Sequence, residues 1–261
     1  SPGGALVVAI ENRFGMKYFS GAPEDHTNLP FEGISGYRRT GAKVMTFGYT
    51  YLSDMLRKHF NGTSFYFPLP DYKMPSCVIS ERMMARADVS ELVASYIADD
   101  SLLKRVPLLD EKSMVTRLQE KKMLPLFMNS FLTFSSDGAL PPGLEDVMGF
   151  MFNTRRKTVF HTVTRFVGEA GAIKVVKTLK SGAGHAENGA LGFEACEHEW
   201  IEGVSLQMAL EKRMDRKNLT LKDLMAPAAV WHAHMRTLSL EGPVSDGLDG
   251  KHIDDIWRNC Y

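Results

Sequence analysis

The sequence predicts an α+β fold in which helices cover one face of an antiparallel β-sheet. Alternating apolar segments come in pairs joined by polar connections, which is typical of β-hairpins, and the amphipathic helical segments are grouped instead of alternating with the strands. A regular alternation of strands and helices would instead indicate a parallel sheet. With 261 residues, of which 44% are hydrophobic and 24% charged, the chain is long enough to bury a full core as one domain over residues 1–261.

The first predicted strands lie in the N-terminal part of the chain. Residues 5–10 form an apolar run and residues 17–19 a shorter one, and we expect a strand at each. A Gly-rich turn over residues 33–41 precedes a third predicted strand over residues 43–52, which would place Val44 and Thr46 on one face and Met45 and Phe47 on the other. A helical turn over residues 53–60 and a turn at residues 61–62 follow.

Residues 77–84 form the next predicted strand, and two helices come after it. Asp88 lies three residues before Glu91, the spacing of a capping box, so we expect a helix to begin here and to run to residue 98. A longer helix is predicted from about Asp110, with a kink or break at Pro125. Its expected buried positions are Met114, Leu118, Met123 and Leu126.

The C-terminal part predicts two hairpins and two further helices. Residues 147–153 and 158–166 form the first hairpin, and residues 172–179 and 190–201 form the second, joined by a Gly-rich connection. A helix is expected over residues 205–214. Thr220 and Asp223 repeat the capping-box spacing at the start of a last helix, which Pro227 should bend.

Charge and cysteine content limit the classes of function. Lys plus Arg and Asp plus Glu number 31 each, so no overall field recruits nucleic acid or a membrane surface, and no apolar run is long enough for a transmembrane segment. Three cysteines, distant in sequence and odd in number, favour a reducing compartment over a secreted disulfide framework. The first residue, Ser1, fits a processed organellar protein or a chain that lacks its first residues.

No motif predicts a metal or another cofactor. Cys196 and His198 would share one face of a strand, but a metal site needs three or four ligands. His232 and His234 are two apart on a predicted helix, so they point in different directions. The Gly-rich connection between the last two strands lacks the Lys-Ser/Thr of a phosphate-binding loop.

A cationic ligand site is predicted where the Gly-rich turn meets the strand of residues 43–52. Arg38, at the mouth of such a strand, can bind a carboxylate or phenolate with two hydrogen bonds while the apolar face holds the rest of the ligand. Tyr37, Thr46 and Tyr49 are the polar neighbours that would complete the site. The alternative is an arginine on a solvated turn, the usual place for this residue type.

The same segment resembles the opening of the chalcone isomerase-like family. That family's turn-and-strand motif matches Gly33, Gly36 and Arg38 in the turn, and Lys43 and Gly48 in the strand. Three later landmarks follow in the family's order: a strand running into a helix (77–97), a Pro-Pro-Gly before a hairpin (141–166) and a C-terminal helix (ending in 241–248). The resemblance implies one chalcone isomerase-like domain with an N-terminal extension over about residues 1–30 and an insertion over about residues 167–218.

The resemblance also implies that catalysis of the plant type has been lost. Met45 stands where plant enzymes carry a threonine and fatty-acid-binding relatives a tyrosine, and Val89 stands where a catalytic tyrosine enters a helix. Losing one such hydrogen-bond donor lowers a rate on the order of 100-fold. A shift of one residue in the register would return Thr46 to the first position, and Tyr49 or Tyr51 can replace a lost hydroxyl.

Three hypotheses of function follow from the resemblance. In the first, the protein is a non-catalytic accessory subunit of a larger mitochondrial assembly, such as a respiratory-chain complex or ATP synthase, and its partners are protein subunits. In the second, it is a carrier that binds a fatty acid or another carboxylate through Arg38. In the third, it is an active isomerase that catalyses an intramolecular addition.

Overall fold

The computed structural model describes residues 4–41, 43–97, 108–138, 144–154, 161–169, 171–179 and 195–203, together with scattered residues between 205 and 233. The chain divides into two compact units, Ser1–Trp200 and Ile201–Tyr261. The first unit holds the sheet and the candidate site, and each unit is described by itself.

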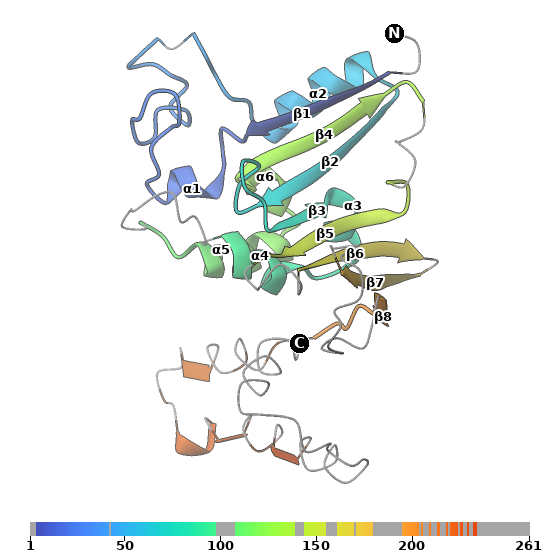
Figure 1. Cartoon of the computed structure of the whole chain (residues 1–261). Coiled ribbons are helices and arrows are strands. Elements are labelled where there is room, and N and C mark those ends of the chain that lie inside the picture. Colours follow the sequence, from blue (N-terminus) through green and yellow to red (C-terminus); the bar gives the residue numbers. More distant parts are fainter. Residues whose placement is uncertain are drawn as a thin grey trace. The chain divides into compact units, whose positions relative to one another are not determined.

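The described part of the first unit is an α+β fold built on one eight-stranded sheet, in the order β1-β4-β2-β3-β5-β6-β7-β8 (Figure 1). Every neighbouring pair of strands is antiparallel, as the sequence predicts. The strands are β1 (Ala5–Glu11), β2 (Gly62–Leu69), β3 (Cys77–Ser80), β4 (Ser130–Ser136), β5 (Val147–Asn153), β6 (Thr162–Glu169), β7 (Ala172–Leu179) and β8 (Ala195–Glu199). The strands β7 and β8, with the end of β6, lie within the predicted insertion and extend the sheet.

The helices pack against one face of the sheet, and Figure 1 shows α2, α3 and α6 behind it. They are α1 (Met16–Phe19), α2 (Tyr49–His59), α3 (Glu81–Arg86), α4 (Ser90–Ile97), α5 (Glu111–Glu120) and α6 (Leu124–Phe127). The core lies between them and the sheet. Phe65, Phe67 and Leu69 point from β2 into this core because alternate side chains of a strand share a face.

Two strands predicted near the N-terminus are wrong. Residues 17–19 belong to the short helix α1, whose Lys17 and Tyr18 are both buried. Residues 43–48 form a loop with a single bridge between Asn12 and Phe47, and the helix α2 begins at Tyr49. Leu52, Ser53 and Leu56 are buried on one side of α2, and this spacing fits a helix because a strand would point the adjacent Leu52 and Ser53 to opposite faces.

The two predicted hairpins are confirmed, and so are most helix starts. Strand β5 pairs with β6, and β7 with β8. Asp110 begins α5 by accepting hydrogen bonds from the amides of Lys112 and Ser113. The strand predicted over residues 77–84 ends at Ser80, whose hydroxyl caps α3 by accepting a hydrogen bond from the Met83 amide at 3.2 Å.

The helix α5 buries a different set of side chains from the expected one. Leu118 is buried as predicted, but Met114 and Met123 are 36% and 40% exposed, and Val115 takes the inward position instead. The predicted break occurs before Pro125: α5 ends at Glu120, and Pro125 lies in the first turn of the separate helix α6, where a proline needs no amide partner.

The sheet face away from the helices carries a row of aromatic side chains. Tyr66 packs edge-on against Phe134 at a ring distance of 5.7 Å, and Phe150 stacks on Phe152 at 6.2 Å. Tyr66 is buried, whereas the three phenylalanines are partly exposed. Within the described residues of the first unit, this face is largely apolar, with the exposed Arg165 opposite Phe150, and has no helix packed on it.

The second unit is described only in short pieces. Thr220 and Asp223 form the predicted capping box: the Thr220 amide donates to the Asp223 carboxylate at 3.0 Å, and the Asp223 amide donates to the Thr220 hydroxyl at 3.3 Å. Of the helix predicted over residues 205–214, Ala209, Arg213 and Met214 are helical. His234, Pro227 and residues 241–248 lie outside the described residues.

Candidate functional site

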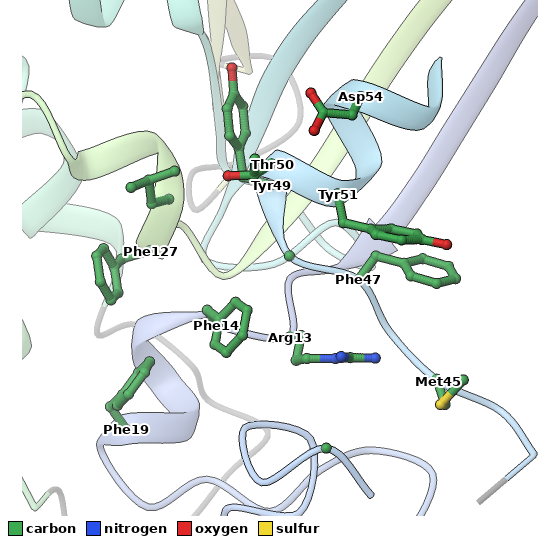
Figure 2. Close-up of a pocket in the computed structure, with 13 residues that line it drawn as sticks. Arg13, Phe14, Phe19, Met45, Phe47, Tyr49, Thr50, Tyr51, Asp54 and Phe127 are labelled. Atoms are coloured by element: carbon green, nitrogen blue, oxygen red, sulfur yellow. The ribbon is translucent and has the colours of Figure 1, made fainter. Parts of the chain in front are cut away.

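A pocket of about 790 Å³ lies where the chain leaves β1, beside the start of α2. Its volume is within the range of small-molecule sites, about 300–1,000 Å³. Figure 2 shows its lining side chains, most of which are aromatic. The lining residues are Arg13, Phe14, Phe19, Gly36, Met45, Phe47, Gly48, Tyr49, Thr50, Tyr51, Asp54, Leu126 and Phe127.

Two aromatic walls flank the side chain of Arg13 (Figure 2). Phe47 and Tyr51 stack on one side, with ring centroids 5.2 Å apart and an angle of 15° between their planes. Phe19 and Phe127 pack at 5.8 Å on the other. Tyr51 is 62% exposed, so the mouth of the pocket presents apolar surface to solvent.

Arg13 supplies the positive charge of the pocket. Its backbone amide donates to the Phe47 carbonyl at 3.0 Å, which fixes the residue between β1 and the loop before α2. Its Nε is buried without a hydrogen-bond acceptor, and the guanidinium lies 5.3 Å from the ring centre of Tyr37. Among the described residues, no carboxylate forms a salt bridge with Arg13. A buried donor without an acceptor favours a bound anion.

The N-terminus of α2 opens into the same pocket. Gly48 is its N-cap residue and offers no side-chain acceptor, and the first turn carries no acidic residue. The first-turn residues Tyr49, Thr50 and Tyr51 line the pocket, so the positive end of this 11-residue helix faces it. A side chain at Gly48 would not fit, because a Cβ there would lie 2.7 Å from the ring of Phe14.

The hydroxyl of Tyr49 is already engaged. It donates a hydrogen bond to the carboxylate of Glu81, and Figure 2 shows it pointing away from Arg13. Burial, followed by the bond to Glu81 and its charge, raises the pKa of Tyr49 above its ordinary value. The ring packs on Phe65 at 4.8 Å. Tyr49 therefore contributes its ring to the pocket and keeps its proton at neutral pH.

Arg38 and its predicted neighbours are placed apart from one another. Arg38 is exposed on the turn and is not among the residues that line the pocket. Tyr37 and Thr46 are buried together: their hydroxyls lie 2.8 Å apart, and the Thr46 amide donates to the Tyr37 hydroxyl at 2.9 Å. Of the four predicted ligand residues, only Tyr49 lines the pocket.

The two positions expected to have lost catalytic hydroxyls also lie in different surroundings. Met45 lines the pocket and is 46% exposed, whereas Val89 is fully buried in the core. Sequence reasoning missed Arg13 and Phe14 altogether. The sequence holds one signal for this site. Arg13 is a single cation next to the aromatic Phe14, shortly after an apolar strand and just before the turn at Gly15.

The loop between α1 and α2 folds around two buried carboxylates. Glu24 accepts hydrogen bonds from the amides of His26 and Thr27, at 2.9 and 2.8 Å. Glu32 accepts from the Arg39 guanidinium at 2.8 Å and from the Thr40 amide at 3.0 Å. The Arg39 bond, with those of Thr40, lowers the pKa of Glu32 against the effect of burial. The Tyr37 hydroxyl donates to Glu24 at 3.3 Å and accepts from the Thr46 amide, which connects this loop to the residue after Met45.

A second ionic cluster ties this loop to the sheet. Lys73 bridges Glu11 at 3.1 Å and Asp25 at 2.6 Å, while Lys17 pairs with Asp71 at 2.8 Å. Burial, and then Asp25, raise the pKa of Glu11. Burial alone would raise the pKa of Asp25 as well, but the bonds to Glu11 and Lys73 outweigh it and lower that pKa to about 2. The cluster is a structural clamp, because none of its members lines the pocket.

No three His, Cys, Asp or Glu side chains converge as metal ligands within the described ranges. No helix in that part of the chain combines the length and the apolar character needed to cross a bilayer.

Comparison with protein-family models, with curated proteins and with solved structures gave no match to this chain. The chalcone isomerase-like family therefore stays a prediction from the sequence motifs.

Proposed function

We propose that the protein binds an amphipathic carboxylate, an apolar chain or ring with one carboxylate group, and does not transform it. The single observation that supports this proposal is the guanidinium of Arg13, whose buried Nε has no acceptor in an aromatic pocket. A carboxylate would supply the acceptor, and the apolar part would cover the exposed rings of the pocket. The proposal keeps the ligand class expected from the sequence and moves its anchor from Arg38 to Arg13.

A second anion-stabilising feature points to the same ligand class. The first turn of α2 has neither a side-chain cap nor an acidic residue, so a carboxylate in the pocket would meet both a cation and the positive end of a helix. Asp54 is the acidic residue among those that line the pocket, and it lies exposed on the solvent side of α2. The charge balance of the inner pocket therefore favours an anion.

We infer that the protein does not catalyse a reaction, because the hydroxyl groups at and near the pocket already form hydrogen bonds within the protein. A proton-transfer group must lie within about 2.6–3.2 Å of the proton that it moves. The hydroxyl of Tyr49 is bound to Glu81, and those of Tyr37 and Thr46 are bound to each other. Turnover of a chalcone by the purified chain would contradict this part of the proposal.

Dodecanoate and dodecanol form a matched pair of probes for the test. Both should be titrated calorimetrically into the purified full chain at neutral pH. We expect dodecanoate to bind at least about tenfold more tightly, since a hydrogen bond to a charged group contributes about 1.5–3 kcal/mol. Equal affinities, or no binding of either probe, would refute the proposal. Mass spectrometry of the protein purified from its own cells identifies the natural ligand.

The accessory-subunit role is a second proposal, and the apolar sheet face favours it. Phe134, Phe150 and Phe152 are partly exposed there, a pattern common at interfaces with partner proteins. The mitochondrial compartment and an ATP synthase or respiratory-chain partner remain part of this proposal. Native gels of isolated mitochondria should then show the protein in a large complex. Phe150→Glu should release it, whereas Lys58→Glu, at an exposed position of α2 on the helix side of the sheet, should not. Migration of the wild-type chain at its own mass would refute this role.

A further inference from the structure

The first strand of the sheet is an open edge with an unusual composition. Among the described residues, β1 pairs with β4 alone. Its residues from Ala5 to Ile10 are all apolar, and Leu6 and Val7 are 41% and 51% exposed. Sheet edges in proteins are normally blunted by charged residues, proline or a bulge, because an unprotected edge pairs with another strand. The edge at β1 has none of these between Ala5 and Ile10.

The direction of the free backbone groups follows from the register. The Asn12 amide donates to the Asn129 carbonyl at 3.0 Å, and antiparallel strands alternate between hydrogen-bonded and non-bonded pairs. The backbone amides and carbonyls of residues 6, 8 and 10 therefore also form hydrogen bonds with β4. Ala5, Val7 and Ala9 direct their amides and carbonyls toward the open edge. The Arg13 amide, which bonds the Phe47 carbonyl, follows the same alternation and marks where the edge becomes covered.

The other edge of the sheet is protected in the usual way. Strand β8 carries Glu197, His198 and Glu199 in its five residues, and charges of this kind discourage strand pairing. The two edges therefore differ in composition, and the apolar one is available for pairing.

We propose that β1 pairs with β1 of a second copy of this chain, antiparallel and across a two-fold axis at Val7. This inference goes beyond the ligand site. In this register Val7 lies opposite its own counterpart, Ala5 lies opposite Ala9, and Leu6 lies opposite Val8, so that apolar side chains meet on both faces of the joined sheet. Glu11 falls outside the paired segment. The strand is thus complementary to itself, as a two-fold interface requires.

The size of the contact sets its expected strength. A pair of seven-residue strands buries less than the roughly 1,000 Å² that a specific interface generally needs. Association should therefore be reversible and concentration-dependent, with the main-chain hydrogen bonds of Ala5, Val7 and Ala9 as its main contribution.

Sedimentation velocity of the purified full chain, from micromolar to millimolar concentrations, tests the proposal. The wild-type chain should pass from monomer to dimer. Val7→Lys should stay monomeric because two like charges would meet on the axis, and Val44→Lys, at a loop position 54% exposed, should dimerise like the wild type. Circular dichroism melts show whether the variants keep their fold.

A mixing experiment tests the register. Val7→Lys and Val7→Glu should each be monomeric, yet an equal mixture should form a heterodimer, since the two side chains would face each other across the axis. A wild-type chain that is monomeric throughout, a dimer that Val7→Lys does not weaken, or a mixture that stays monomeric would each overturn the proposal. Dodecanoate binding by Val7→Lys should be unchanged, which separates this outcome from a failure of the ligand site.

Discussion

Replacing Arg13 by glutamine should weaken dodecanoate binding and leave dodecanol binding unchanged. Glutamine keeps a polar side chain of moderate length, but it removes the charge and the fork of donors that a carboxylate uses. The sequence points to Arg38 as the anchor, and the structure points to Arg13. Arg38→Gln is therefore the matched control, because it removes the same charge from an exposed turn outside the pocket.

The magnitude follows from the surroundings of the guanidinium. A charge-assisted hydrogen bond contributes about 1.5–3 kcal/mol, and about 1.4 kcal/mol corresponds to a tenfold change in affinity. The Nε of Arg13 is buried, but the whole side chain is only partly buried, which favours the lower half of the range. We expect dodecanoate affinity to fall about 10- to 40-fold in Arg13→Gln and less than about twofold in Arg38→Gln.

Isothermal titration at neutral pH, at low and at high salt, measures both effects. The difference between dodecanoate and dodecanol should shrink in Arg13→Gln and persist in Arg38→Gln. Arg13 also lies over the ring of Tyr37, so thermal melts must accompany the titrations. If Arg38→Gln abolishes the carboxylate preference and Arg13→Gln keeps it, the assignment of the anchor is wrong and the sequence hypothesis is right.

Three further predictions concern stability. Gly48→Ala should destabilise the fold by about 1–3 kcal/mol and weaken dodecanoate binding, because the new Cβ would lie 2.7 Å from the Phe14 ring; urea unfolding and calorimetry measure the two effects. Lys17→Met should lower the free energy of unfolding by about 3–5 kcal/mol, since it leaves the largely buried Asp71 carboxylate without its partner; urea unfolding measures this too. The pKa of Asp25 is lowered from an ordinary 3.8 to about 2, so its ionised carboxylate stabilises the folded state at pH values above 3.8. This contribution is lost as the pH falls from about 4 to about 2. After allowance for solvent screening it amounts to about 1 kcal/mol, and Asp25→Asn should flatten that part of the stability profile.

Each of these predictions has a control and a contrary outcome. Gly138→Ala adds a Cβ where no atom lies within 4 Å, and it should leave stability unchanged. Lys58→Met removes an exposed lysine and should have little effect. Equal effects of the paired glycine or lysine substitutions would contradict the packing and ion-pair explanations. If the free energy of unfolding of the wild-type chain stays constant as the pH is lowered past about 4, the assignment of Asp25 is contradicted.

Hairpins and helix caps could be predicted because their signals are local. The alternation in β6 and β7 and the caps at Asp110 and Thr220 depend on residues within a few positions of one another. The segment before α2 misled the prediction because Val44, Met45 and Phe47 also fit an alternating strand. The burial of the adjacent Leu52 and Ser53 together with Leu56 fits a helix, and the sheet that α2 packs against is formed by distant parts of the chain.

The candidate site was harder to predict than the fold. Arg13 is a candidate ligand residue because it lines one pocket with Phe47, Tyr51 and Phe127, which come from segments far apart in sequence. No local pattern separates such an arginine from an exposed one like Arg38. The Gly-rich sequence correctly predicts a tight loop. However, Tyr37 points into the interior of that loop, where its hydroxyl lies beside that of Thr46.

The self-contained hydrogen bonding of the loop around Glu24 and Glu32 has a consequence for its evolution. Because these two acids organise the segment through its own amides and Arg39, the exposed side chains of Ser35 and Arg38 take no part in these contacts. In a deep mutational scan, Ser35 and Arg38 should therefore accept nearly every residue, while the two acids should accept almost none. The segment would diverge quickly between species at its surface and keep an invariant skeleton.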